Sequence, residues 1–172
     1  WEQGNVLSRA VDDLLFRRPP RLDGHAGGAL IGETGELLPQ VIACAARLDG
    51  TTLCIQGPPG TGKTFSAAAI IAELLRRGQR IGVTATSHKV ILNLLKAVVK
   101  ARGGAKGPGR LYKVGNKADD GDDPLLANGA VARLESKQVT EVVGDGPVLV
   151  GGTAWVFSRP ELAGRFDYLF ID

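Results

Sequence analysis

A glycine-rich loop of eight residues, Gly57–Thr64, constrains the fold of this chain more than any other feature of its 172 residues. It completes the pattern GxxxxGK[ST] with Gly57, Pro58, Pro59, Gly60, Thr61, Gly62, Lys63 and Thr64. Residues 51–55 (TTLCI) predict a short buried strand before it, and residues 65–77 (FSAAAIIAELLRR) predict an amphipathic helix closed by Gly78. Strand, loop and helix in this order predict a phosphate-binding loop at a helix N-terminus.

The residue types in the loop suit the binding of phosphate. Glycines let successive backbone N–H groups turn toward phosphate oxygens without clashes from a Cβ atom. Lys63 can reach the β- and γ-phosphates, and the hydroxyl of Thr64 can ligate Mg²⁺. We therefore expect the chain to bind a nucleoside triphosphate with Mg²⁺.

The rest of the chain alternates between helical and extended patterns. Helices are predicted over residues 6–16, 37–48, 88–100 and, weakly, 130–137. Further strands are predicted over residues 80–85, 111–114, 148–150 and 168–171. Strands separated by helices indicate an α/β fold with a parallel sheet and right-handed crossovers.

A second candidate for metal chemistry is Asp172, which follows the apolar run Tyr168–Ile171. A hydrophobic strand that ends in an Asp is the Walker B arrangement, in which the carboxylate holds Mg²⁺ opposite the hydroxyl of the phosphate loop. The pattern is weak alone but gains weight beside an unambiguous phosphate loop. Thr64 and Asp172 are therefore the predicted metal ligands.

Composition limits the class of protein only loosely. The formal net charge of +3 mildly favours a polyanionic partner. The sequence has no run of about 18 apolar residues and no signal-peptide pattern, so we expect a cytoplasmic protein without a membrane span. Cys44 and Cys54 are expected to be reduced and buried.

Several segments resemble the first motor domain of a superfamily 1 helicase, from the 5′→3′ branch that includes the nonsense-mediated-decay helicase and the DNA-processing nuclease-helicases. The stretch IQGPPGTGKT is typical of that branch, and Gln40 precedes Gly57 by 17 residues, a spacing similar to its glutamine motif. Residues 83–90 occupy the place of motif Ia, although Thr86-Ser87-His88 replaces Pro-Ser-Asn. Residues 150–154 resemble the Gly-Thr turn, and residues 166–172 resemble the start of the DEAx motif.

The resemblance implies a RecA-like P-loop NTPase domain that binds ATP and single-stranded DNA or RNA. It implies that Gln40 reads the adenine edge, that Lys63 stabilises the transferred phosphoryl group, and that Thr64 and Asp172 hold Mg²⁺. It assigns contacts with nucleic-acid phosphates to Ser87, His88, Lys89, Gly152 and Thr153. A second RecA-like domain of the same protein would be the partner that supplies arginine fingers.

The resemblance also suggests a division of the chain. Residues 1–36 would be a pre-motor segment, a helix followed by a glycine-rich linker, and residues 37–172 a partial motor domain with a short insertion at about 115–146. Residues 14–22 resemble the stretch before the motor in bacterial proteins that fuse a RecB-like nuclease to such a helicase. The sequence contains no Met and stops at Asp172, where relatives continue with a water-orienting Glu. We therefore expect a truncated, inactive piece of an ATP hydrolase.

Other functions stay open at this point. The full protein could be a repair or regulatory ATPase without unwinding activity, and this piece could bind nucleotide and nothing more. Residues 102–110 (RGGAKGPGR) favour a solvated linker over a nucleic-acid contact, and Asp119–Asp123 favours a solvated turn over a Ca²⁺ site. His88 favours a hydrogen-bonding role at a helix start, and for Trp155 and Phe157 a core or interface role is favoured over base stacking.

Overall fold

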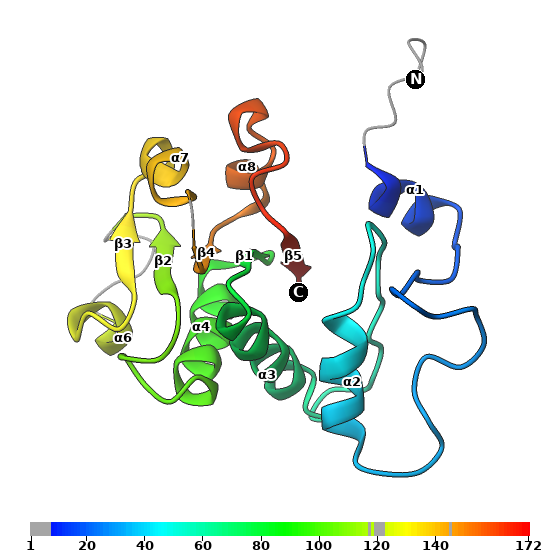
Figure 1. Ribbon diagram of the computed structural model, residues 1–172. Helices are drawn as coiled ribbons and strands as arrows, with labels where there is room; N and C mark the ends of the chain where they lie inside the picture. Colours follow the sequence, from blue (N-terminus) through cyan, green and yellow to red (C-terminus); the bar gives the residue numbers. More distant parts are fainter. Residues whose placement is uncertain (1–7, 117, 119–122, 145) are drawn as a thin grey trace. The chain divides into compact units, whose positions relative to one another are not determined.

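The computed structural model describes residues 8–116, 118, 123–144 and 146–172. The chain divides into two compact units, Trp1–Ser66 and Ala67–Asp172, called the first and the second unit below (Figure 1). The boundary falls within one continuous helix, α3 (Lys63–Arg76), which begins in the phosphate loop. Each unit is described by itself.

The second unit contains a five-stranded sheet in the order β3-β2-β4-β1-β5. Every pairing is parallel, which confirms the predicted α/β architecture. The central β4 aligns Gly151 with Val83 of β1 on one side and with Lys113 of β2 on the other. The strands are β1 (Arg80–Thr84), β2 (Arg110–Val114), β3 (Ala132–Leu134), β4 (Val148–Gly151) and β5 (Tyr168–Ile171).

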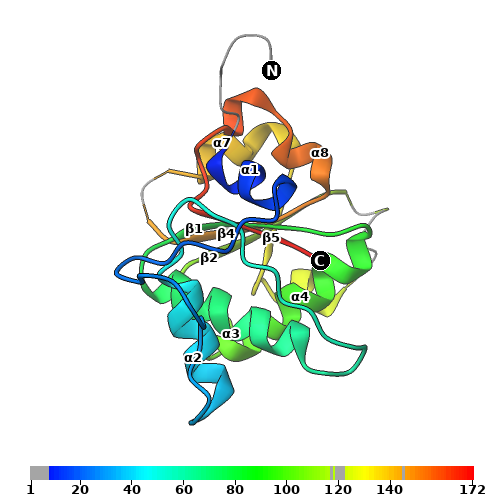
Figure 2. The same ribbon diagram turned by 90° about the vertical axis from the view of Figure 1, so that its right-hand side faces the viewer.

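Helices cover both faces of this sheet, with α3 and α4 (His88–Ala101) on one face and α7 (Val139–Val142) and α8 (Ala154–Phe157) on the other (Figure 2). The apolar side chains of α4 recur at helical spacing and are buried, among them Ile91, Leu95 and Val98. A Cβ atom at Gly151 would lie 2.8 Å from Cγ2 of Ile91, so glycine at this position lets α4 approach β4 closely. The opposite face has its own apolar core, formed by Val114, Leu134, Val139, Val143, Val148, Val150, Val156 and Leu162.

One element prediction in the second unit is wrong. Residues 130–137 were expected to form a helix, but Ala132–Leu134 forms β3 and pairs with β2. Backbone pairing along β2 outweighs the weak helical pattern, because strand formation depends on neighbours more than on intrinsic preference. The described residues of this unit also contain the short helices α6 (Pro124–Ala127), η1 (Ser136–Gln138) and η2 (Pro160–Leu162). The predicted insertion at 115–146 lies partly outside the described residues, as do Asp119, Asp120, Gly121 and Asp122 of the acidic turn.

The segment 102–110, predicted to be a solvated linker, is exposed at most of its positions, but its first residue, Arg102, is not. The guanidinium of Arg102 is buried and donates hydrogen bonds to the carbonyls of Ala105, Gly107, Pro108, Gly109 and Ala130. Burial lowers the pKa of this guanidinium from its ordinary value. The loop between α4 and β2 is therefore folded around one arginine, which the sequence pattern did not indicate.

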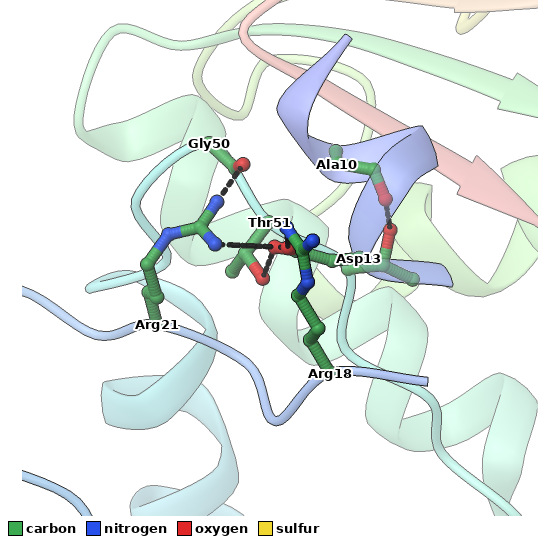
Figure 3. A network of polar contacts seen from close by, with 7 residues as sticks. Ala10, Asp13, Arg18, Arg21, Gly50 and Thr51 are labelled. Carbon is green, nitrogen blue, oxygen red and sulfur yellow. Dashed lines mark hydrogen bonds and ion pairs between the residues drawn. The ribbon is translucent and has the colours of Figure 1, made fainter. Parts of the chain in front are cut away.

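The first unit contains α1 (Arg9–Leu15), α2 (Leu37–Ala45) and long irregular segments. A polar network holds α1 to the residues that lead toward the phosphate loop (Figure 3). Its centre is the buried carboxylate of Asp13, which accepts from Oγ1 of Thr51 at 2.6 Å and pairs with Arg21 at 2.7 Å. Beside it, Thr52 donates to the carbonyl of Ala10 at 2.7 Å.

The predicted buried strand over residues 51–55 is not formed. These residues have no regular secondary structure, and Cys54 and Ile55 are exposed. A β-branched, apolar run becomes a strand only where a neighbouring strand offers backbone partners, and no strand in the described part of the chain pairs with this one. The expectation of two buried cysteines is likewise correct for Cys44 and wrong for Cys54; both are free thiols.

Candidate nucleotide and nucleic-acid sites

The phosphate loop has the backbone conformation that its glycines permit. Gly60 and Gly62 have φ values of 82° and 83°, in the left-handed region that other residues rarely adopt. A Cβ atom at Gly57 would lie 2.6 Å from Oγ1 of Thr61, so the first position also requires glycine. The hydroxyl of Thr61 donates to the carbonyl of Pro58 at 2.8 Å and fixes the turn.

Lys63 begins α3, two residues earlier than the sequence predicted. Its ammonium lies over the loop and donates to the carbonyls of Gly57 at 2.6 Å and Pro58 at 2.9 Å. Thr64 follows within the first turn of the helix, where unpaired N–H groups and the helix dipole favour an anion. The loop, the cation and the helix start thus lie in one place, as a phosphate site requires.

A pocket of about 430 Å³ adjoins the loop within the first unit. One wall is the exposed face of α2, and the other comes from the loop and the first turn of α3. Its lining is mostly apolar with a few polar groups, which is typical of sites for small organic ligands. The lining residues are Leu37, Leu38, Val41, Ile55, Gln56, Gly57, Pro58, Thr61, Lys63, Phe65 and Ser66.

Gln40 lies on α2, but its side-chain amide contacts the loop that precedes this helix. Its Oε1 accepts a hydrogen bond from the backbone N–H of Gly32 at 2.7 Å, and its Nε2 donates to the carbonyl of Thr34 at 2.9 Å. The two contacts fix the orientation of the amide, because only one assignment of O and N satisfies both. A role in reading adenine stays a prediction.

A second group of predicted residues lies in the second unit, at the carboxyl ends of adjacent strands. Ser87 caps α4 after β1, and its Oγ accepts from the N–H of Val90 at 3.3 Å. Gly152 follows β4 and donates its N–H to the carbonyl of Val83 at 2.9 Å, and Thr153 is the N-cap of α8. Because β1 and β4 are parallel neighbours, both segments lie together at the carboxyl-terminal end of the sheet.

His88 is held at this edge by a residue that sequence reasoning missed. Nδ1 of His88 lies 2.8 Å from Nζ of Lys113, a fully buried side chain that also donates to the carbonyl of Val114 at 2.7 Å. An ammonium has only donors, so Nδ1 accepts and the ring proton of a neutral His88 is on Nε2. The contact spans β4 at the register of Gly151. A lysine inside an apolar strand pattern, LYKV, was the only signal for it.

Asp172 directly follows β5, as predicted, and its backbone N–H donates to the carbonyl of Thr84 at 3.0 Å. Asp172 is exposed, while the hydroxyl of Thr84 is buried and has no hydrogen-bond partner among the residues that the structure describes. Thr64 belongs to the first unit and Asp172 to the second, so joint ligation of Mg²⁺ by the two stays a prediction.

Comparison with known proteins gives one family. A family model described as an AAA domain matches residues 39–143, more than half of the chain. The matched region contains the phosphate loop, α3, β1, α4 and β2. No curated protein matches the chain. None of the helices in the described residues is long and apolar enough to cross a membrane.

Proposed function

This chain belongs to the AAA domain family and is a P-loop NTPase of the helicase type, and we propose that it is the ATP-binding motor domain of a nucleic-acid helicase or translocase. The observation that carries the proposal is the phosphate loop itself. Two left-handed glycines, the start of α3 and the ammonium of Lys63 converge at the edge of a pocket large enough for a nucleobase.

In this proposal the triphosphate occupies the loop and takes over the ammonium of Lys63 from the two carbonyls. Phosphate oxygens carry full charge, so their hydrogen bonds to Lys63 are stronger than those of neutral carbonyls. The charge that develops on the γ-phosphoryl group during transfer is stabilised by the same side chain. The base packs between α2 and Phe65, where apolar side chains line the pocket.

Thr64 and Asp172 are the groups proposed to hold Mg²⁺. A hydroxyl in the first turn of α3 and a carboxylate at a strand end are both oxygen donors, which Mg²⁺ prefers. When bound, the cation would neutralise charge on the β- and γ-phosphates. Gln40 is proposed to select adenine.

The surface at the carboxyl ends of β1 and β4 is the proposed contact surface for single-stranded DNA or RNA. Ser87, His88, Lys89 and Thr153 offer hydroxyl, imidazole and ammonium groups, which suit contacts with phosphates that do not depend on sequence. Gly152, whose own N–H is bound to the carbonyl of Val83, belongs to the turn that presents Thr153. Trp155, two residues after Thr153, is 83% exposed, so it can stack on a base. A second RecA-like domain would complete the motor, and a fused nuclease is a further proposed neighbour.

Two measurements test this function. Calorimetric titration with Mg-ATP should give saturable binding to this chain, and a labelled 20-nucleotide single strand should bind with an affinity that falls as salt rises. A strand-displacement assay on the full-length protein should show ATP-dependent unwinding. Binding of ATP without displacement would instead identify an ATPase without unwinding activity, and absence of nucleotide binding would reject the proposal.

A further inference from the structure

The amide of Gln40 makes two hydrogen bonds with the backbone of its own chain. One joins Oε1 to the N–H of Gly32 and the other joins Nε2 to the carbonyl of Thr34, at 2.7 and 2.9 Å. Both contacts are exposed, and all three residues lie in the first unit. A backbone donor and a backbone acceptor, two residues apart, therefore face one side-chain amide.

Adenine offers the same pair of groups along one edge. Its N6 amino group is a donor and its N7 is an acceptor, and a glutamine amide pairs with both at once. The N–H of Gly32 corresponds to N6, and the carbonyl of Thr34 corresponds to N7. Guanine presents acceptors at both O6 and N7, so it cannot replace the N–H of Gly32.

We infer that the segment Gly32–Thr34 is a built-in competitor of adenine for Gln40, which ATP displaces and GTP does not. The inference depends on the proposed role of Gln40 in reading the base. ATP binding then exchanges two hydrogen bonds inside the protein for two with the nucleotide, and the segment leaves α2. Base selectivity is set jointly by Gln40 and by the segment that covers its amide.

Gly32 of this segment and Gly35, directly after it, are suited to such an exchange. Cβ atoms at Gly32 and Gly35 would each lie 3.3 Å from the polar atoms of the amide, so larger residues would crowd it. Gly35 has a φ of 98°, which most other residues rarely adopt. Gly32 and Gly35 thus let the backbone on both sides of Glu33 and Thr34 lie close to the amide of Gln40.

The test removes the competing donor and keeps Gln40 itself in the chain. Gly32→Pro deletes the N–H at a position outside the left-handed region. Its ring would also crowd Oε1 of Gln40, since a Cβ atom there lies 3.3 Å away, so both changes disfavour the contact between the segment and the amide. In the full chain we expect Mg-ATP to bind about 3- to 10-fold more tightly to Gly32→Pro, the effect of one net hydrogen bond. Affinities for Mg-GTP and tripolyphosphate should not change. Ala29→Pro, in the same irregular segment, is the matched control and should leave all three affinities unaltered.

A double mutant shows whether the effect passes through the amide. In a Gln40→Ala background, Gly32→Pro should no longer alter ATP affinity. An effect that persists there, or equal changes for ATP and GTP, would overturn the inference. If the unmodified chain binds tripolyphosphate but neither nucleotide, the base site fails while the phosphate loop stands, and absence of all binding rejects the proposed function as a whole.

Hydrogen exchange of the unmodified protein gives an independent measurement should the proline variant not fold. The amide of Gly32, followed by NMR, should be protected without nucleotide and should exchange faster in Gln40→Ala. Mg-ATP should accelerate its exchange, whereas Mg-GTP and tripolyphosphate should not. Protection that is unchanged by Mg-ATP at saturation would contradict the displacement of the segment.

Discussion

At the scale of single residues, Lys63 supplies the positive charge on which the proposed nucleotide site depends. Its ammonium already lies over the loop, bound to the carbonyls of Gly57 and Pro58. Hydrogen bonds to charged groups are worth about 1.5–3 kcal/mol, so Lys63→Ala should weaken Mg-ATP binding about 10- to 100-fold by calorimetry. Lys89→Ala, an exposed cation on α4, is the control and should leave ATP affinity unchanged. Equal ATP affinity for Lys63→Ala and the unmodified chain would reject the assignment.

Asp13 gives a second prediction at this scale, because its carboxylate is buried among donors. Hydrogen bonds from Thr51 and then Arg21 hold its pKa below the ordinary value of 3.8. A carboxyl with a lowered pKa in the folded state adds stability above its ordinary pKa, and this stability is lost as pH falls through the folded value. Urea unfolding from pH 7 to 3 should therefore show a loss at the acid end that Asp13→Asn reduces, together with lower stability at pH 7.

The neighbouring variant Asp12→Asn removes the same charge and controls for a general effect of net charge. It should keep the acid-dependent loss of stability, since the contacts with Thr51 and Arg21 remain. Identical pH profiles for Asp12→Asn and Asp13→Asn would show that the network in Figure 3 does not contribute.

At the scale of elements, α8 places two aromatic residues, Trp155 and Phe157, in different surroundings, although the sequence predicted the same role for both. Phe157 is partly buried, meets the edge of Phe166 at a centroid distance of 5.3 Å and packs beside Gly82, while Trp155 is exposed. Phe157→Ala should lower the free energy of unfolding by about 2 kcal/mol, and Trp155→Ala by less than about 0.5 kcal/mol.

In oligonucleotide titrations Trp155→Ala should weaken binding by about 1–3 kcal/mol if the ring stacks on a base. An unchanged affinity would assign Trp155 to a protein interface instead.

The helices and strands also show which elements the periodicity of apolar residues can predict. It predicted the strands β1, β2, β4 and β5 and the helices α3 and α4. In β1, β2, β4 and both helices the apolar pattern matches the face that the element buries, whereas β5 is an edge strand with Leu169 and Ile171 exposed. It failed for residues 51–55 and for β3, where the partner strand and not the local pattern decides the structure.

For the candidate sites, too, some features could be predicted from the sequence and others could not. The glycine positions of the phosphate loop follow from the motif, since Gly60 and Gly62 need left-handed backbone. Lys113 beside His88 and Arg102 at the centre of its loop could not be foreseen, because each depends on contacts between residues distant in sequence or on the path of a whole loop. Buried charges of this kind stand out only when their partners are known.

At the scale of the whole molecule, we expect α3 to link ligand binding to stability. Its first turn, with Lys63, carries the phosphate site in the first unit, and Ile70, Ile71, Leu74 and Leu75 are buried in the second. Because helix formation is cooperative, stabilising the first turn should also protect the rest of α3. We therefore expect ATP to stabilise both units and not only the one that contains the loop.

A ligand that binds only the folded state at 100 times its Kd adds about 2.7 kcal/mol to the free energy of unfolding. Hydrogen exchange, measured with and without ATP, should show this gain as greater protection of the amides of α2, in the first unit, and of β1, in the second. Lys63→Ala at the same ATP concentration should show most of the gain lost at both places, since its site is no longer saturated. Protection of α2 alone, with β1 unaffected, would mean that the two units unfold independently and that the boundary within α3 is a point of separation.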